Sequence, residues 1–224
     1  MKTINFLKFK SVLEYLQIHF KDDMLFGLSF ISFSSLANYT IAYDRIIITK
    51  LNLSTNYKSR FIYTADQVTK VINTLLFPIN TKVSGKLGRL YREKQYAFFH
   101  KEIDYSVLIT LGIGTTITLL GYVIFSGINF FGMKMIIEPN ALIQYSISNV
   151  LYLSAVLLQK KFDYSKFLKF LPLLLLLTSF FITYIFRKIF FNEEVSFFLI
   201  VSCFYFILLF ISVIIIKYKR HEFN

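Results

Sequence analysis

The sequence contains few of the residues on which most metal and redox sites depend. It has one cysteine and three histidines in 224 residues. Cys203 stands alone inside an apolar run, which excludes a disulfide framework and a cysteine metal site. The histidines, His19, His100 and His221, are widely separated and form no ligand cluster. We therefore expect no metal ion and no cofactor.

Patterns typical of catalysis or nucleotide binding are also missing. Gly112 and Gly114 resemble the start of a phosphate loop, but no third glycine follows and the segment is apolar. The sequence contains no pattern typical of a Ser-His-Asp catalytic triad. His100 precedes Asp104 by four residues, and one such helical pair is common by chance. We expect a protein that is not an enzyme, with a membrane acyltransferase or phosphatase using His100 as the enzyme alternative.

Acidic residues are scarce, with 13 Asp and Glu against 25 Lys and Arg, which gives a net charge of +12. This balance favours an anionic partner such as nucleic acid only where basic and aromatic residues share a patch on a soluble domain. Here the basic residues lie between long apolar runs. In that position they set the topology of a membrane protein. We therefore expect no nucleic-acid partner.

Apolar residues, by contrast, are abundant. The chain is 55% hydrophobic, contains 27 Phe and has a mean hydropathy of +0.57. Several apolar runs reach the length of about 20 residues needed to span a bilayer. The sequence predicts an all-α polytopic membrane protein with six transmembrane helices in one bundle over 24–216. The predicted spans are 24–49, 60–80, 103–125, 141–158, 167–186 and 195–216.

The two ends of the chain are predicted to lie outside the bundle. In 1–23, apolar residues recur at helical spacing among lysines, a pattern typical of an amphipathic helix in the membrane interface, with a connector between helices that packs on protein as the alternative. Residues 217–224 form a basic tail. If the N-terminus is cytoplasmic, the cytoplasmic segments carry more than twice as many basic residues as the opposite side. The positive-inside rule therefore places both termini in the cytoplasm.

The stretch 61–90 differs from the other apolar runs. Tyr63, Asp66, Lys70 and Asn73 recur every three or four residues and form a polar stripe on one face of a helix. Pro78 is expected to weaken the helix near its end, before a basic loop. Charged residues within a membrane normally face a partner or a watery cavity. This helix is the predicted wall of a transport pathway, and the alternative is that Asp66 and Lys70 neutralise each other for packing.

The order of features in the first half resembles the second lobe of polysaccharide flippases of the O-antigen type, in the MATE-like exporter superfamily. An apolar helix ends on YDRIII at 43–48, and IYTADQVTKVINTLLFPI follows at 62–79 after a short polar loop. Basic residues come next, namely Lys82, Lys86, Arg89, Arg92 and Lys94. The later spans are similar only in number and spacing.

The resemblance implies a transporter of the bacterial inner membrane. Its substrate would be a polyprenyl-diphosphate-linked oligosaccharide, moved to the outer leaflet for synthesis of a surface polysaccharide such as O-antigen, part of lipopolysaccharide, or capsule. Family members have two six-helix lobes around a central cavity, and this sequence has room for one. The resemblance therefore implies that the chain acts with a separate N-terminal lobe or a second copy of itself, in contact with membrane lipid.

The same resemblance suggests roles for five charged residues. Arg45, Arg60 and Lys70 are the candidates for binding the diphosphate, for which arginine is well suited because its fork meets phosphate oxygens in pairs. Asp44 and Asp66 are the candidates for orienting these cations or coupling an ion. Two alternatives remain open. Arg45 and Arg60 would be interfacial anchors, or the chain would be a non-transporting scaffold or remnant lobe that associates with polysaccharide-assembly enzymes.

Overall fold

The computed structural model describes residues 38–40, 42–50, 54–130, 137–163, 168, 170–190 and 195–222. Five long helices lie in this part of the chain: α2 (Thr55–Arg92), α3 (Tyr96–Phe130), α4 (Pro139–Asp163), α5 (Leu171–Phe190) and α6 (Phe197–Glu222). Residues 38–40 and 42–50 are also helical, and the described residues contain no strand. The predicted amphipathic segment 1–23 and most of the first span, 24–49, lie outside the described residues.

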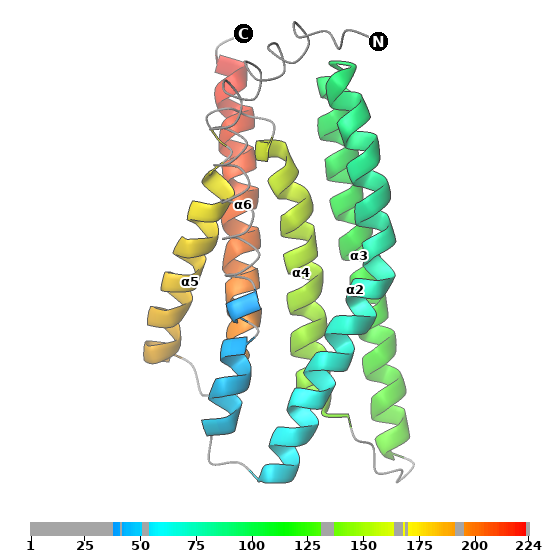
Figure 1. Ribbon diagram of the computed structural model, residues 1–224, viewed down its shortest axis with the longest axis vertical. Coiled ribbons are helices and arrows are strands. Elements are labelled where there is room, and N and C mark those ends of the chain that lie inside the picture. The colour runs from blue at the N-terminus through cyan, green and yellow to red at the C-terminus, as the bar shows by residue number, and fades with distance from the viewer. Residues whose placement is uncertain are drawn as a thin grey trace, which may run out of the picture.

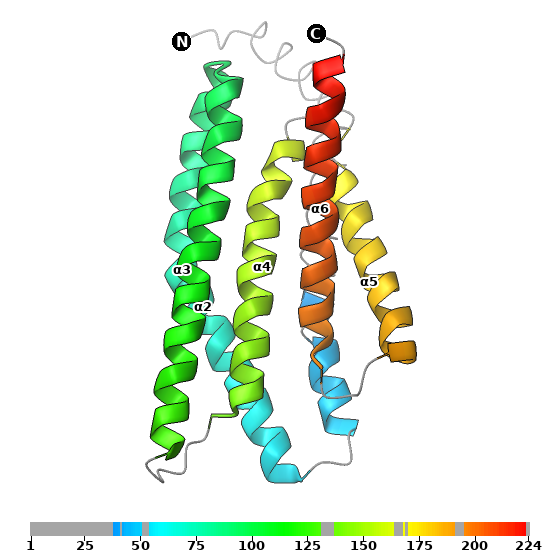
Figure 2. The same ribbon diagram turned by 180° about the vertical axis from the view of Figure 1, so that it is seen from behind.

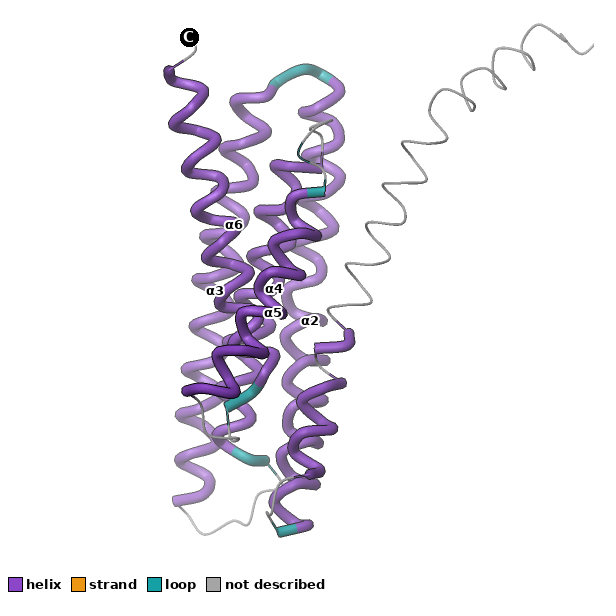
Figure 3. Tube along the Cα trace, turned by 90° about the vertical axis from the view of Figure 1, so that its left-hand side faces the viewer, coloured by secondary structure: helices purple, strands orange, loops and turns teal. Residues whose placement is uncertain are grey.

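The helices run up and down along one common direction, and α4 lies between the others (Figures 1 and 2). It packs against α2 and α3 on one side and against α6 on the other, while α5 packs mainly on α6. The side view shows the same arrangement, with the helices roughly parallel to one axis (Figure 3). In α4, 61% of the most apolar 18-residue segment is buried inside the structure, against 22–28% of the corresponding segments of α3, α5 and α6. The fold is therefore organised around α4.

The sequence of α4 suits this central position. Small and polar residues such as Ser148, Asn149 and Ala155 are almost completely buried along it. Small residues let neighbouring helices approach closely. A Cβ atom on Gly114 of α3 would overlap the methyl groups of Val150. The two helices therefore approach closely at Gly114, but Gly112 has no neighbouring atom within 4 Å of such a Cβ.

Within the described residues, four helices are long and apolar enough to cross a membrane, as expected for a multi-pass membrane protein: Tyr96–Phe125, Pro139–Phe162, Leu171–Lys188 and Phe197–Ile216. They correspond to the last four predicted spans. The predicted span 60–80 falls within α2, which is helical but is not among these four. Six spans and cytoplasmic termini therefore remain predictions.

Two details of α2 differ from the sequence-based expectation. The helix does not end after Pro78 but continues to Arg92. Proline removes one backbone donor, yet apolar residues on both sides of it, including Leu76 and Val83, remain buried against the bundle. Packing of this face maintains the helix across the interruption. The basic residues expected in a loop consequently lie on helices, except those at the turn between α2 and α3.

That turn is short and defined by backbone hydrogen bonds. The amide of Gln95 donates to the Leu90 carbonyl at 2.9 Å, and the amide of Lys94 donates to the Tyr91 carbonyl at 3.0 Å. This pattern is a Schellman motif, in which the residue after the cap adopts a left-handed conformation. Lys94 has that conformation, with φ of 58°. The motif turns the chain directly from α2 into α3 and holds the basic residues near one end of the bundle.

Candidate functional site

The two long faces of α2 differ in chemistry. Phe61, Ala65, Ile72 and Leu76 are buried against the bundle. The predicted polar stripe lies elsewhere around the helix, where Tyr63, Lys70 and Asn73 are exposed and Asp66 is half-buried. The stripe therefore forms part of the outer surface of this bundle. It is available to water, to another protein or to a ligand.

Asp66 forms an ion pair with Arg45, which lies on the helical segment 42–50. The sequence left open whether Asp66 pairs with Lys70 on its own helix. In the structure the partner comes from a different helix, 21 residues earlier in the chain. The side chains of Arg45 and Asp66 keep 48% and 34% of their exposure, so the pair is accessible. It joins the 42–50 segment to α2 at the outer surface.

Lys70 lies on the same stripe, one turn after Asp66. The structure thus gathers three of the five predicted site residues, Arg45, Asp66 and Lys70, on one surface. Arg60 lies six residues before Asp66, which places it about 9 Å away along the axis and about 120° around the helix. It is therefore not part of the same stripe.

Asp44 is buried, with 1% of the residue exposed, and its side chain points into the bundle. Its carboxylate accepts hydrogen bonds from the Tyr145 hydroxyl at 3.0 Å and from the Ser196 hydroxyl at 2.6 Å. It also accepts from the backbone amides of Phe197 and Phe198, at the start of α6. The first amides of a helix have no partner within the helix and favour negative charge. Asp44 therefore caps α6 from another segment of the chain.

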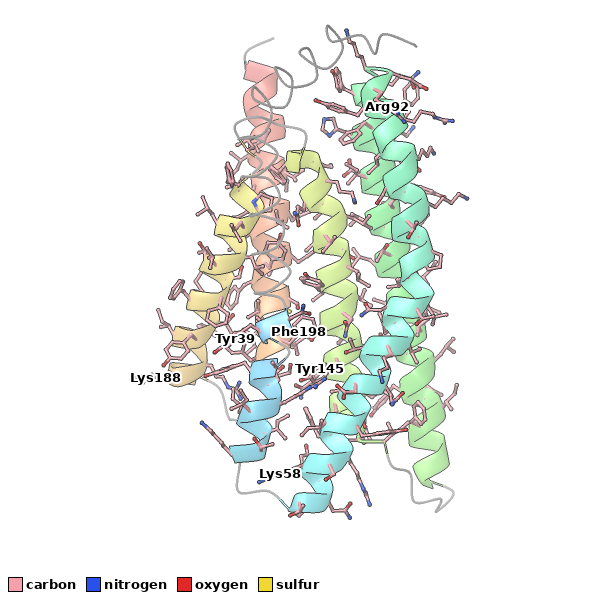
Figure 4. The ribbon with its side chains drawn as sticks, in the orientation of Figure 1. Tyr39, Lys58, Arg92, Tyr145, Lys188 and Phe198 are labelled. Carbon is pink, nitrogen blue, oxygen red and sulfur yellow. The ribbon has the colours of Figure 1, made fainter. Side chains whose placement is uncertain are left out.

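Aromatic rings enclose this carboxylate. The rings of Tyr43 and Phe197 pack edge to face with centroids 4.8 Å apart, and Phe61 packs edge to face on Tyr145. Tyr145 and Phe198 come from α4 and α6 and lie side by side, with centroids 6.2 Å apart (Figure 4). The Gln144 side chain accepts from the Ser196 amide at 2.6 Å. We call Asp44, Tyr145, Gln144, Ser196 and these rings the capping network.

Two hydrogen bonds connect α2 to α4 and its preceding residues. The Asn149 side chain donates to the Thr69 hydroxyl at 3.1 Å, and the Glu138 amide donates to the Thr64 hydroxyl at 2.8 Å. Gln144 and Asn149 of α4 therefore both contribute to contacts between helices. These bonds fix the rotation of α2 about its axis and so keep the polar stripe on the outer surface.

Sequence reasoning missed the roles of Tyr145 and Ser196 in the capping network. Ser196 carries a recognisable signal, because it directly precedes the apolar run that becomes α6 and serine is a preferred N-cap residue. Its hydroxyl also accepts from the Leu199 amide at 3.2 Å. Tyr145 carries no such signal. It lies 101 residues from Asp44, and only the packing of α4 brings the two together.

The enzyme alternative requires His100 to act with Asp104. The Asp104 carboxylate forms an ion pair with Lys161 of α4. No group of three or more His, Cys, Asp or Glu side chains that could hold a metal ion occurs in the described part of the chain.

Comparisons of the chain with family models, with curated proteins and with solved structures found no match.

Proposed function

We propose that the chain is one lobe of a transporter that moves a polyprenyl-diphosphate-linked oligosaccharide across the cytoplasmic membrane of a bacterium. The second lobe is a partner chain or a second copy, and both termini of this lobe are cytoplasmic. The observation that carries the proposal is the contrast between the polar, charged outer face of α2 and the apolar outer faces of α3, α5 and α6.

The outer faces of three helices are suited to lipid. Many of their exposed side chains are large and apolar, including Leu108 and Leu119 of α3, Phe181 of α5 and Ile207 of α6. The outer face of α2 instead presents Asp66, Lys70 and Asn73. Charged side chains facing hydrocarbon cost several kcal/mol and are therefore found on a protein partner or a water-filled cavity. This face supports a role as the lining of a polar path completed by another lobe.

The chemistry of the stripe fits the proposed cargo. A diphosphate requires cations, which Lys70 and Arg45 supply, and the Arg45 fork can meet two phosphate oxygens at once. Asp66 holds Arg45 in place until a phosphate replaces it as partner. Sugar hydroxyls require neutral hydrogen-bonding groups, of which Asn73 is one. The polyprenyl tail stays in lipid, and no bond is made or broken in the transport step.

The test is transfer of a lipid-linked oligosaccharide to the outer leaflet, followed as surface glycan display in the cell or as protected substrate in vesicles. We expect Lys70→Gln to lower transfer at least tenfold at unchanged protein level, since one lost charge-assisted phosphate contact is worth about 1.5–3 kcal/mol. The matched control is Lys188→Gln, an exposed lysine at the end of α5. Normal transfer by both single variants, Lys70→Gln and Arg45→Ala, would refute the assignment of the diphosphate-binding site to this stripe.

Two further outcomes identify the other classes of function. Loss of glycan on His100→Ala alone would favour the enzyme. Normal glycan transfer in the absence of the chain, with loss of an assembly enzyme from the membrane, would favour a scaffold. The Arg45–Asp66 ion pair is the observation consistent with a scaffold, because a neutralised pair is suited to protein packing.

A further inference from the structure

The connection between α2 and α3 carries six basic residues, which we call the basic tip: Lys82, Lys86, Arg89, Arg92, Lys94 and Lys101. All six are exposed, and only two carboxylates, Glu93 and Glu102, lie within the same stretch of sequence. Lys86 donates to Glu102 at 2.7 Å, and Arg89 lies 3.9 Å from Glu93. Most of the positive charge of the basic tip is therefore not neutralised by the acidic residues near it.

The position of the membrane along α3 follows from its charged residues. Lys101, Glu102 and Asp104 precede residues 105–125, which contain no charged side chain, and a hydrocarbon core of about 30 Å is spanned by about 20 residues. The hydrocarbon core then begins close to Tyr105. Lys101 and Glu102 lie just outside it, and the bond from Lys86 to Glu102 places Lys86 of α2 at the same level.

From that level the basic tip extends through the headgroup layer. Arg92 follows Lys86 by six residues, or about 9 Å of helix, whereas the polar layer on each side of a bilayer is roughly 5–8 Å thick. Lys82 lies about 6 Å on the hydrocarbon side, a distance that a lysine side chain spans when it snorkels to the interface. The basic tip therefore extends from the edge of the hydrocarbon core to beyond the headgroup layer, and its outermost residues lie within about one Debye length of the lipid phosphates.

The outer face of α3 adds a second, independent feature. Phe98, Lys101 and Tyr105 follow one another at helical spacing, and the two rings are 64% and 61% exposed. Aromatic rings that flank a cation are typical of the membrane interface, where one part of the side chain contacts acyl chains and the other contacts water. This pattern favours a lipid surface over a soluble anion as the ligand, because a soluble anion makes no apolar contacts with exposed rings.

We infer that the basic tip is a binding surface for the headgroups of anionic phospholipids. The phosphates attract Arg89, Arg92 and Lys101, while the ring of Tyr105 packs on the adjoining acyl chains and the ring of Phe98 lies on the water side of them. The inference does not depend on the transport proposal, because these residues lie at the end of α2 beyond the polar stripe. It assigns the basic tip a binding role in addition to its effect on topology.

The test uses the full-length chain purified in neutral detergent. Bound lipids are counted by native mass spectrometry during titration with phosphatidylglycerol or phosphatidylcholine. We expect preferential retention of phosphatidylglycerol, and its affinity to fall about 10–30-fold in the double variant Arg92→Gln/Lys101→Gln, because each basic residue near an anionic surface contributes about 1 kcal/mol. The charge-preserving double variant Arg92→Lys/Lys101→Arg should bind like the unmodified chain.

The matched control removes two charges at the other end of the bundle, by Lys50→Gln/Lys188→Gln. Lys188 lies at the end opposite Arg92 (Figure 4), and this variant should retain its phosphatidylglycerol. Equal loss from both double variants would overturn the inference, because it would indicate attraction by net charge alone. Competition by millimolar inorganic phosphate as effective as that of the lipid would also overturn it, since the occupant would then be a free anion.

Discussion

The capping network buries a charged group, whereas the polar stripe of α2 and its partner Arg45 leave theirs at the surface. The two charged residues concerned, Asp44 and Arg45, are neighbours in the sequence. The Asp44 carboxylate is buried and accepts hydrogen bonds from hydroxyls and from the first amides of α6. The Arg45 guanidinium lies at the outer surface, with a single carboxylate as partner. Adjacent residues on a helix are about 100° apart, so one side chain points into the bundle when the other points out.

This difference separates stability from function. A buried carboxylate that satisfies several donors cannot be removed without leaving those donors unpaired. An exposed ion pair contributes little to folding, because water solvates both partners when they separate. We therefore expect substitutions around α4 to change the stability of the fold, and substitutions on the polar stripe to change what the protein binds or moves.

The largest expected effect is that of Asp44→Ala. The hydroxyls of Tyr145 and Ser196 and two amides of α6 would lose their acceptor, which should lower the free energy of unfolding by about 3–5 kcal/mol. Asp44→Asn keeps one acceptor oxygen but adds donors to a site that already contains donors. Its free energy of unfolding should therefore lie between those of the unmodified protein and Asp44→Ala. Thermal unfolding in detergent measures both. A change below about 1 kcal/mol in Asp44→Ala would remove the distinction between the two regions.

A smaller effect is expected at the contact between α3 and α4. Gly114→Ala places a methyl group against the stiff side chain of Val150 and should destabilise the fold by about 1–3 kcal/mol. Gly112→Ala is the matched control two residues away, because no atom lies near its Cβ position. It should be neutral or stabilising by up to about 1 kcal/mol, since alanine favours helix. Restored stability in Gly114→Ala/Val150→Ala would identify the contact as the cause.

The smallest effect on stability is expected for the ion pair itself. A double-mutant cycle with Arg45→Ala and Asp66→Ala should give a coupling energy of less than about 1 kcal/mol, because both side chains are partly exposed. A coupling energy above about 2 kcal/mol would mean that the pair is a structural element like the capping network. Glycan transfer measured on the same variants shows whether the stripe acts in transport despite its small contribution to folding.

The comparison also shows which features were predictable from the sequence. The last four predicted spans coincide, to within several residues, with helices long and apolar enough to cross a membrane, because long apolar runs determine where such helices form. The polar stripe of α2 was also visible, since helical spacing fixes which side chains share a face. The end of α2 was predicted wrongly at Pro78. Local preference favours a break there, but burial on both sides of the proline maintains the helix.

Sequence alone determined the class of the molecule, its apolar helices and the clustering of basic residues between the apolar stretches. These properties depend on composition and on residues less than about two turns apart. Only the tertiary structure decided that Asp66 pairs with Arg45 rather than Lys70, and that Asp44 caps α6. Both contacts join helices whose relative rotation is set by packing around α4. No local pattern records that rotation, because it results from the combined fit of side chains far apart in the chain.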